Sequence, residues 1–360
     1  TSAHPDGDVR IFHKQCVSLA NMGYKVSLII PNTTARTEKG VNIISFESSY
    51  KSRRERMTIT VKKVLEEALK LDANIYHLHD PELLKIAKKL KRKGKKVVYD
   101  VHEDLPRQIM SKHWIPKHLR SIISKTTELY EDKVSRQLDG IVTATPFIRD
   151  RFLKINPNTT DINNFPILTE LLIEQDYNLK TEDNICYVGG ITRTRGIFEL
   201  VDSLKSTSAK LLLAGNYLES DIRNELLKKS SWSQITELGF LNRNEVKEVY
   251  KKSKLGIVTL HPIENYIDSL PVKMFEYMAA GIPVIASNFN LWKSIVEENN
   301  CGICVNPLNS PEISSAIEKL LRNPEMAAEM GKNGQELVVN NYNWEIEEKK
   351  LLTFYKSLIG

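Results

Sequence analysis

The sequence predicts an α/β protein made of two Rossmann-like halves, and three observations lead to this expectation. The chain has 360 residues, more than one hydrophobic core usually serves, so about two domains are expected. Short runs of β-branched and other apolar residues recur along it, with helix-like spacing between most of them. A polar, proline-containing break at residues 157–166 divides the chain near its middle. Strands that alternate with helices form parallel sheets covered on both faces, with ligands at the carboxyl ends of the strands.

The predicted elements follow one another in a regular order. A loop-like opening leads into a helical pattern from Val9 to Ala20. A strand should precede this helix, so the first strand is expected to be missing and that edge of the sheet incomplete. Further helices are expected over residues 147–155, 271–280 and 344–358. The expected strands are residues 26–30, 97–101, 141–144, 185–188, 211–214, 255–259, 283–286 and 302–305.

The polar break also separates two regions of opposite charge. Residues 1–165 hold 30 Lys and Arg against 19 Asp and Glu, whereas residues 166–360 hold 21 against 26, so the net charges are +11 and −5. The predicted domains are residues 1–165, residues 166–342 and a terminal helix at 343–360. A basic half suggests a polyanionic partner, such as an anionic membrane surface or nucleic acid.

Composition narrows the class of protein. No apolar run approaches the roughly 18 residues that a membrane span needs, and no secretory signal opens the sequence, so a cytoplasmic protein is expected. Four scattered cysteines argue against a disulfide framework and are expected to be reduced. The pair Cys301 and Cys304 lacks two further zinc ligands nearby, which favours a structural role.

The segment from Asp268 to Ser287 carries the strongest chemical pattern. Pro271 lies in the first turn of a predicted helix that ends before Gly281, and a helix amino terminus favours a diphosphate. The Asp268 and Glu276 carboxylates can accept hydrogen bonds from the hydroxyls of a sugar or a ribose. On spacing alone, an ordinary amphipathic helix with a surface glutamate is the favoured alternative.

The full string Asp268-Ser-Leu-Pro-Val-Lys-Met-Phe-Glu276, followed by Tyr-Met-Ala-Ala-Gly-Ile-Pro-Val-Ile-Ala-Ser, resembles the acidic-x7-Glu signature of family-four retaining glycosyltransferases of the GT-B fold. That fold places two Rossmann-like domains on either side of a cleft. The resemblance implies that Asp268 contacts the transferred sugar and Glu276 the nucleotide ribose. Relatives usually have Glu and Gly where this chain has Asp268 and Pro271. Because proline has no N–H, Leu270, Val272 or the Lys273 ammonium is expected to hold the diphosphate instead.

Two glycine-containing loops of the second half extend the resemblance. Gly189 and Gly190 follow a predicted strand, and Arg193 and Arg195 come next. Relatives carry Arg where this chain has Gly190 and Lys where it has Arg195. Both arginines are therefore expected at the phosphates, with a surface position as the alternative for Arg193.

Further along the second half, Gly215 and Phe240 lie in loops that border the nucleotide in relatives, Phe240 beside the base. Alone, Gly215 and Gly239 are plain strand-to-loop turns.

In the first half, His102 follows the predicted strand 97–101 and resembles a strand-end histidine that lies beside the donor sugar. His79 and Asp80 form a second strand-end cluster, and a structural role is equally expected for His79. Arg10 and Lys14 lie four residues apart on a helix that relatives use near the acceptor. A solvated surface charge is favoured for Lys14.

The resemblance implies a retaining glycosyltransferase that needs no cofactor and no metal ion, and no Asp-x-Asp follows a predicted strand. His102, Asp268 and Arg195 are the expected catalytic residues. The expected partners are a nucleotide-sugar donor, a saccharide or lipid-linked saccharide acceptor in surface polysaccharide assembly, and an anionic membrane on whose inner face the protein would be peripheral. The alternatives are a nucleotide-sugar epimerase of GT-B architecture and a non-catalytic sugar-nucleotide binder. Nucleic acid is not expected, since no binding module is recognisable.

Overall fold

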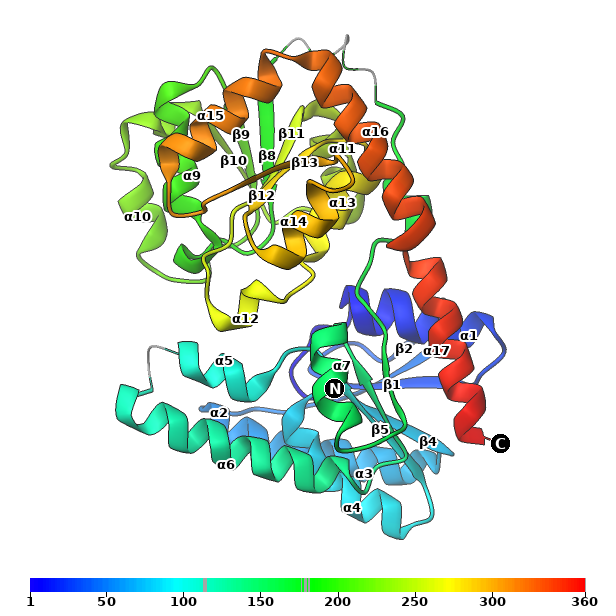
Figure 1. Ribbon diagram of the computed structural model, residues 1–360. Coiled ribbons are helices and arrows are strands. Elements are labelled where there is room, and N and C mark those ends of the chain that lie inside the picture. The colour runs from blue at the N-terminus through cyan, green and yellow to red at the C-terminus, as the bar shows by residue number, and fades with distance from the viewer. Residues whose placement is uncertain (113–114, 176, 178–179, 181, 360) are drawn as a thin grey trace. The chain divides into compact units, whose positions relative to one another are not determined.

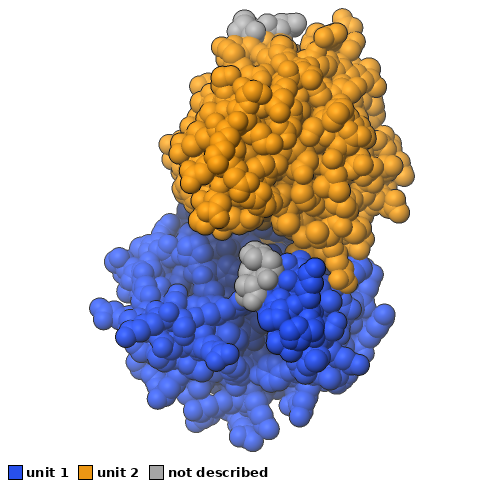
Figure 2. All heavy atoms as spheres, turned by 90° about the vertical axis from the view of Figure 1, so that its left-hand side faces the viewer, with its two compact units in different colours: residues 1–164, 346–360 blue, residues 165–345 orange. Residues whose placement is uncertain are grey.

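The computed structural model describes residues 1–112, 115–175, 177, 180 and 182–359. The chain forms two compact units (Figure 2): residues 1–164 with 346–360 make unit 1, and residues 165–345 make unit 2. Unit 2 is thus inserted in the sequence between the body of unit 1 and its last helix. The predicted boundaries were 165/166 and 342/343.

Unit 1 contains two sheets (Figure 1). The larger is fully parallel, with the order β4-β5-β6-β7. The smaller has the order β1-β3-β2, in which β1 and β3 run parallel and β2 runs antiparallel to β3. The strands are β1 (Val26–Pro31), β2 (Arg36–Glu38), β3 (Val41–Phe46), β4 (Ile75–Leu78), β5 (Lys96–Val101), β6 (Gly140–Thr143) and β7 (Thr159–Asp161).

Apolar stripes on the helices of unit 1 cover these sheets. Val61, Val64 and Ala68 of α3 are buried at the three- and four-residue spacing of one helix face, as are Leu84, Ala87 and Leu90 of α4. The helical segments are η1 (Val9–Cys16), α1 (Val17–Asn21), α2 (Arg53–Glu55), η2 (Arg56–Thr60), α3 (Val61–Leu71), η3 (Pro81–Leu83), α4 (Leu84–Arg92), α5 (Leu105–Ser111), α6 (Lys117–Ser135), α7 (Pro146–Leu153) and α17 (Trp344–Ile359).

Unit 2 is built on one six-stranded parallel sheet with the order β10-β9-β8-β11-β12-β13. The order of the strands reverses between β8 and β11, so the loops at their carboxyl ends leave a crevice where α/β proteins bind ligands. The strands are β8 (Asn184–Val188), β9 (Lys210–Ala214), β10 (Ile235–Gly239), β11 (Leu255–Val258), β12 (Val284–Ser287) and β13 (Gly302–Val305).

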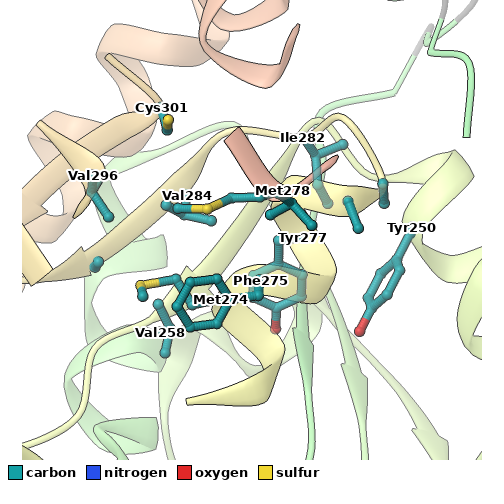
Figure 3. Packing of buried hydrophobic residues seen from close by; sticks show 14 of the residues in the cluster. Tyr250, Val258, Met274, Phe275, Tyr277, Met278, Ile282, Val284, Val296 and Cys301 are labelled. Atoms are coloured by element: carbon teal, nitrogen blue, oxygen red, sulfur yellow. The ribbon is translucent and has the colours of Figure 1, made fainter. Parts of the chain in front are cut away.

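Helices cover both faces of this sheet, over two separate hydrophobic cores. Figure 3 shows one core, in which Met274, Phe275 and Met278 of α13 pack with Val258 and Val284. The helical segments are α8 (Leu168–Leu171), η5 (Arg193–Arg195), α9 (Ile197–Ser203), η6 (Leu204–Ser206), α10 (Ile222–Leu226), η7 (Ser230–Gln234), α11 (Arg243–Lys252), α12 (Glu264–Ile267), α13 (Val272–Ala279), α14 (Asn290–Val296), α15 (Ser310–Leu321) and α16 (Pro324–Asn341).

The predicted α/β class is confirmed, and each predicted strand overlaps an observed one. The polar segment 157–166 contains a strand that was not predicted, because Thr159–Asp161 forms β7 and pairs with β6. The four cysteines are free thiols, and burial raises the pKa values of Cys301 and Cys304 to about 12. Within the described part of the chain, no helix is long and apolar enough to cross a membrane.

Candidate active site

Backbone alone forms the crevice edge at the ends of β8 and β9. The Gly189 N–H donates to the Ala214 carbonyl (2.9 Å), and the Gly215 N–H donates to the Gly239 carbonyl (2.7 Å). Gly189 and Gly215 have φ values of 130° and 137°, a region that side chains rarely allow. A Cβ on Gly215 would lie 2.0 Å from the Gly189 carbonyl oxygen. The two loops therefore pack closely against each other, and only glycine fits at position 215.

Helix α13 begins beside this edge. Pro271 is its N-cap residue rather than part of its first turn, and no side chain caps the helix. Its first N–H groups, including that of Val272, are therefore open to an anion. The Trp292 indole N–H donates to the Ser269 carbonyl (2.7 Å) and fixes the loop before the helix. Leu270 and Val272 are both half-buried.

Lys273 and Arg195 lie beside the loop that contains Gly189 and Gly190 and place two basic side chains there. The Lys273 ammonium lies 3.5 Å from the centroid of the Tyr187 ring and would touch a Cβ on Gly189. Arg195 donates to the Gly190 carbonyl (3.1 Å). Although Lys273 as a residue is half-buried, its Nζ is buried and has no hydrogen-bond partner among the described residues. Burial, and then repulsion from Arg195, hold the pKa of Lys273 well below its usual range.

Glu276 faces into the protein. It is 7% exposed, its Oε1 accepts a hydrogen bond from the Arg243 guanidinium (2.7 Å), and its Oε2 accepts one from the Tyr250 hydroxyl (3.0 Å). Arg243 also donates to Glu170 (2.9 Å). The surface-glutamate alternative is therefore wrong. A carboxylate has about four acceptor positions, so Glu276 keeps room for two hydroxyl donors.

Asp268 and Arg193 are placed differently from each other. Asp268 ends α12 and is half-buried, and its carboxylate has no hydrogen-bond partner in the part of the chain that the structure describes. Arg193 pairs with Glu219 and Glu225 and lies over the Phe198 ring at 4.6 Å. The structure therefore gives Arg193 the surface position, where two carboxylates already neutralise it, and does not support it as a phosphate ligand.

A pocket of about 310 Å³ lies next to the glycine edge. Gly215 and Gly239 line it together with Tyr217, Arg223 and Glu237. The last three residues were not predicted from the sequence. Glu237 accepts hydrogen bonds from Tyr217 (2.6 Å) and from two nitrogens of Arg223 (3.0 and 2.9 Å). Phe240 is 77% exposed beyond the end of β10. Its side chain is thus free to meet a ligand ring.

In unit 1, a buried carboxylate organises the histidines. Asp100 accepts hydrogen bonds from Arg10 (3.2 and 2.7 Å) and from Gln15 (2.7 Å). His79 and His102 place nitrogens 3.3 and 3.5 Å from Asp100 Oδ2, and 3.2 Å from each other. Burial would raise the pKa of Asp100, but Arg10 and the histidines outweigh it and hold that pKa well below its usual range.

Burial also acts on the histidines of this cluster. It lowers the pKa of His77 to about 4 and that of His79 well below its usual range. His77, His79 and Asp100 bring ligand atoms within 4.8 Å of one another, as a metal ion would require. Both Asp100 oxygens already accept hydrogen bonds from Arg10, so the arrangement works as an ion-pair network.

The expectation of a solvated Lys14 is wrong. Lys14 is 1% exposed, and its ammonium donates to the Asn164 carbonyl (3.1 Å) and side-chain oxygen (2.5 Å). Arg10 is buried as well and also donates to the Ile162 carbonyl (2.6 Å). Both cations hold the first helical segment against the end of the sheet.

His79, Asp100 and His102 line a second pocket, of about 600 Å³, at the carboxyl ends of β4 and β5. Its walls come from η2, α4, α5 and α6, and no sequence pattern indicated them. Each unit therefore carries a cavity at the carboxyl edge of its main sheet. The two differ in chemistry: glycines and the Arg223–Glu237 ion pair line the pocket of unit 2, and histidines around a buried carboxylate line that of unit 1.

Two Rossmann-like domains, one with an anion-ready helix start and a buried glutamate, define a GT-B glycosyltransferase architecture. Family models match both parts of the chain: the model described as glycosyltransferase family 4 covers residues 6–163, and that of glycosyl transferases group 1 covers residues 171–337. The chain belongs to the group 1 glycosyltransferases of the GT-B fold.

Comparisons with individual proteins support this family assignment. The chain is 26% identical over 250 residues to an uncharacterised glycosyltransferase, MJ1607, of Methanocaldococcus jannaschii, covering 67% of this chain and 58% of that protein. It is 26% identical over 202 residues to the capsular polysaccharide biosynthesis glycosyltransferase CapM of Staphylococcus aureus, covering 52% and 51%. The matches thus span a little over half the length of these relatives. The structure of HepE from Anabaena in complex with UDP has a TM-score of 0.73 at 13% identity, covering 99% of this chain and 98% of HepE.

Proposed function

We propose that this protein transfers a sugar from a nucleoside-diphosphate sugar to a saccharide or lipid-linked saccharide acceptor. Transfer would retain the anomeric configuration and use no metal ion. The observation that carries the proposal is the buried Lys273 ammonium beside Arg195, at the uncapped start of α13. An unneutralised buried cation is costly, and a diphosphate bound there would supply the missing negative charge.

Donor binding would use the remaining residues of the same crevice. The diphosphate would meet Lys273, Arg195 and the first N–H groups of α13. Glu276, held by Arg243 and Tyr250, would accept hydrogen bonds from the ribose hydroxyls. Asp268, whose carboxylate has no partner among the described residues, would accept hydrogen bonds from the transferred sugar. Phe240 beside the pocket at Gly239 would contact the base.

The chemistry would proceed on one face of the sugar. The acceptor hydroxyl oxygen bonds to the anomeric carbon while the bond to the diphosphate oxygen breaks, and the departing oxygen takes the hydroxyl proton. Negative charge grows on the diphosphate during this step, and Arg195, Lys273 and the α13 amino terminus would stabilise it. His102 is proposed as a catalytic residue on the sequence resemblance alone.

The acceptor is proposed to lie in polysaccharide or glycolipid assembly, which is supported by the similarity to CapM. An anionic membrane is proposed as the working surface. Leu119, Ile122 and Ile123 are exposed on one face of α6, and Lys117 and Lys125 are exposed on the same helix. Apolar side chains with flanking cations are what binds a helix to the interface of an anionic bilayer.

A binding and turnover assay tests the proposal. Nucleoside diphosphates and their sugars, UDP among them, should raise the melting temperature of the protein, and Lys273→Met should sharply reduce this shift. Lys252→Met is the matched control, since Lys252 is exposed on α11 and lies outside the crevice. The active donor should then yield product with retained configuration in the presence of a chelator.

Two outcomes would contradict the proposal. One is the absence of any shift with every nucleotide. The other is formation of a new sugar nucleotide from donor alone, which would indicate an epimerase.

A further inference from the structure

The pocket in unit 1 has a polar floor, and its walls come from segments far apart in the sequence. His79, Asp100 and His102 form the floor. Arg53, Arg56 and Met57 approach from α2 and η2, while Leu105 and Tyr130 come from α5 and α6. Its volume of about 600 Å³ lies within the range of small-molecule sites, roughly 300–1,000 Å³.

The acidic residues of this pocket already have partners. Asp80 accepts hydrogen bonds from Thr1 and Ser2 and pairs with His4, and Glu82 pairs with Arg56. Asp100 is paired with Arg10, and Glu131 with Arg151 and Tyr99. Glu103 accepts a hydrogen bond from the Gln108 side chain. Glu103 is the exception, since its partner is uncharged and its carboxylate raises the pKa of Lys112. Among the described residues, none of the five carboxylates pairs with Arg53 or Lys85.

Two cations at the rim have no carboxylate partner. The Lys85 ammonium donates only to the Met57 carbonyl (3.0 Å), and within the described residues the Arg53 guanidinium makes no hydrogen bond or ion pair. Burial and then Arg53 lower the pKa of Lys112, at the end of α5, while the Glu103 carboxylate acts in the opposite direction. Positive charges therefore gather around this rim, and an anion placed among them would relieve their repulsion.

Apolar side chains line the pocket beside these cations. Met57, Leu84, Leu105 and Tyr130 line the pocket together with the rim cations and the histidines. A ligand that suits all three surfaces has hydroxyls for the floor, an anionic group for the rim and an apolar part for the wall. Phosphate esters of sugars provide the first two, and lipid phosphates of saccharides provide all three.

We propose that this pocket binds a phosphate group of the acceptor through Arg53 and Lys85, so that the acceptor substrate is a phosphate-bearing saccharide. The inference rests on the proposed transferase function and specifies its substrate class. The phosphate is held by charge-assisted hydrogen bonds from both side chains. The source of the phosphate, a lipid carrier or a free sugar phosphate, is distinguished by the experiment.

Direct binding to the full chain tests this. The probes are farnesyl phosphate, glucose 1-phosphate and the uncharged octyl glucoside, measured by calorimetry at constant ionic strength. Arg53→Gln/Lys85→Gln should weaken the binding of the phosphate probes about tenfold or more and leave octyl glucoside unchanged. Arg54→Gln is the matched control, because Arg54 is exposed on the same short helix but does not line the pocket.

The outcomes separate cleanly. Tighter binding of farnesyl phosphate than of glucose 1-phosphate assigns the phosphate to a lipid, and equal binding assigns it to a sugar phosphate. Equal binding of octyl glucoside and the phosphate probes, or no effect of the double variant, overturns the inference. Nucleotide binding is measured on the same samples. If the wild-type protein binds no nucleotide, the proposed function is contradicted. If it binds nucleotide but the double variant binds the phosphate probes as well as the wild type does, only this inference is contradicted.

Discussion

Lys273 is the residue at which stability and ligand binding oppose each other. Its ammonium is buried without a hydrogen-bond partner in the described chain, against the face of Tyr187 and close to Arg195. A cation–π contact recovers only part of the hydration energy that a buried ammonium loses. The fold therefore tolerates a charge that only a bound anion would satisfy.

Lys273→Met should stabilise the free protein by about 1–3 kcal/mol, because it removes an unpaired buried charge while keeping a similar volume. The same change should weaken nucleoside-diphosphate binding roughly 10- to 100-fold, since a charge-assisted contact is lost. Chemical denaturation and calorimetry measure the two effects. Loss of stability without loss of nucleotide affinity would contradict the assignment.

The stability difference should also depend on pH. The pKa of Lys273 is lowered in the folded protein and is about 10.4 when unfolded, so the unfolded state binds more protons between these values. The destabilisation is complete below the folded pKa and disappears as the pH rises to about 10.4. Wild-type and Lys273→Met stabilities should therefore converge in alkaline solution, and parallel curves would be evidence against a depressed pKa.

Arg243 is a residue that sequence reasoning missed, and it is expected to position Glu276. Arg243→Ala should reduce the preference for UDP over its 2′-deoxy analogue, because Glu276 loses a fixed orientation toward the ribose. Glu276→Gln should reduce it further. Glu170→Gln, which removes only the other partner of Arg243, serves as the control. An unchanged preference in Glu276→Gln would place the ribose elsewhere.

At the residue scale, the sequence indicated Glu276, Lys273 and Arg195 because they stand in a recognisable string or next to a glycine loop. It missed Arg243 and Tyr250, which reach Glu276 from a different helix, α11. It also placed Lys14 in solvent, because helix spacing does not reveal that Asn164, distant in the chain, accepts its hydrogen bonds. Contacts between distant segments are the part that local patterns do not encode.

At the element scale, Gly215 and Gly239 at the ends of β9 and β10 should respond very differently to substitution. Gly215→Ala should destabilise the protein by about 3–5 kcal/mol, because a Cβ there would lie 2.0 Å from the Gly189 carbonyl oxygen at a φ of 137°. Gly239→Ala should cost only about 1 kcal/mol, since its φ is 66° and no atom lies within 4 Å. Thermal unfolding of the two variants checks the difference. Equal losses would show that backbone strain alone sets the effect.

The elements themselves followed from the sequence to different degrees. Buried strands such as β8 and β11 are continuous apolar runs and were predicted, as was the loop, helix and strand around α13. Strand β7 was not, because Thr159–Asp161 is short and polar and lies at the edge of its sheet. Pairing with β6, rather than local preference, makes it a strand.

At the scale of the whole molecule, positive charge and exposed apolar side chains both favour unit 1, at helix α6, as the surface that binds a membrane. The wild-type protein should sediment with anionic vesicles at low salt and be released as ionic strength rises. Ile122→Ser should lower the bound fraction, because Ile122 is 61% exposed on α6. Leu218→Ser, at an equally exposed leucine in unit 2, should not. Equal effects of both variants would indicate nonspecific adsorption.

The place of α17 in the chain has a consequence for synthesis. Residues 346–360 belong to unit 1, where Phe354 packs on Gly140 and the Tyr355 hydroxyl is 2.7 Å from His77 Nδ1. All of unit 2 is translated before these residues appear. Domains usually fold in the order in which they leave the ribosome, at about 5–20 residues per second. In this chain the order is reversed. Unit 2 can complete its folding first, because the last helix of unit 1 is synthesised on the order of a second later.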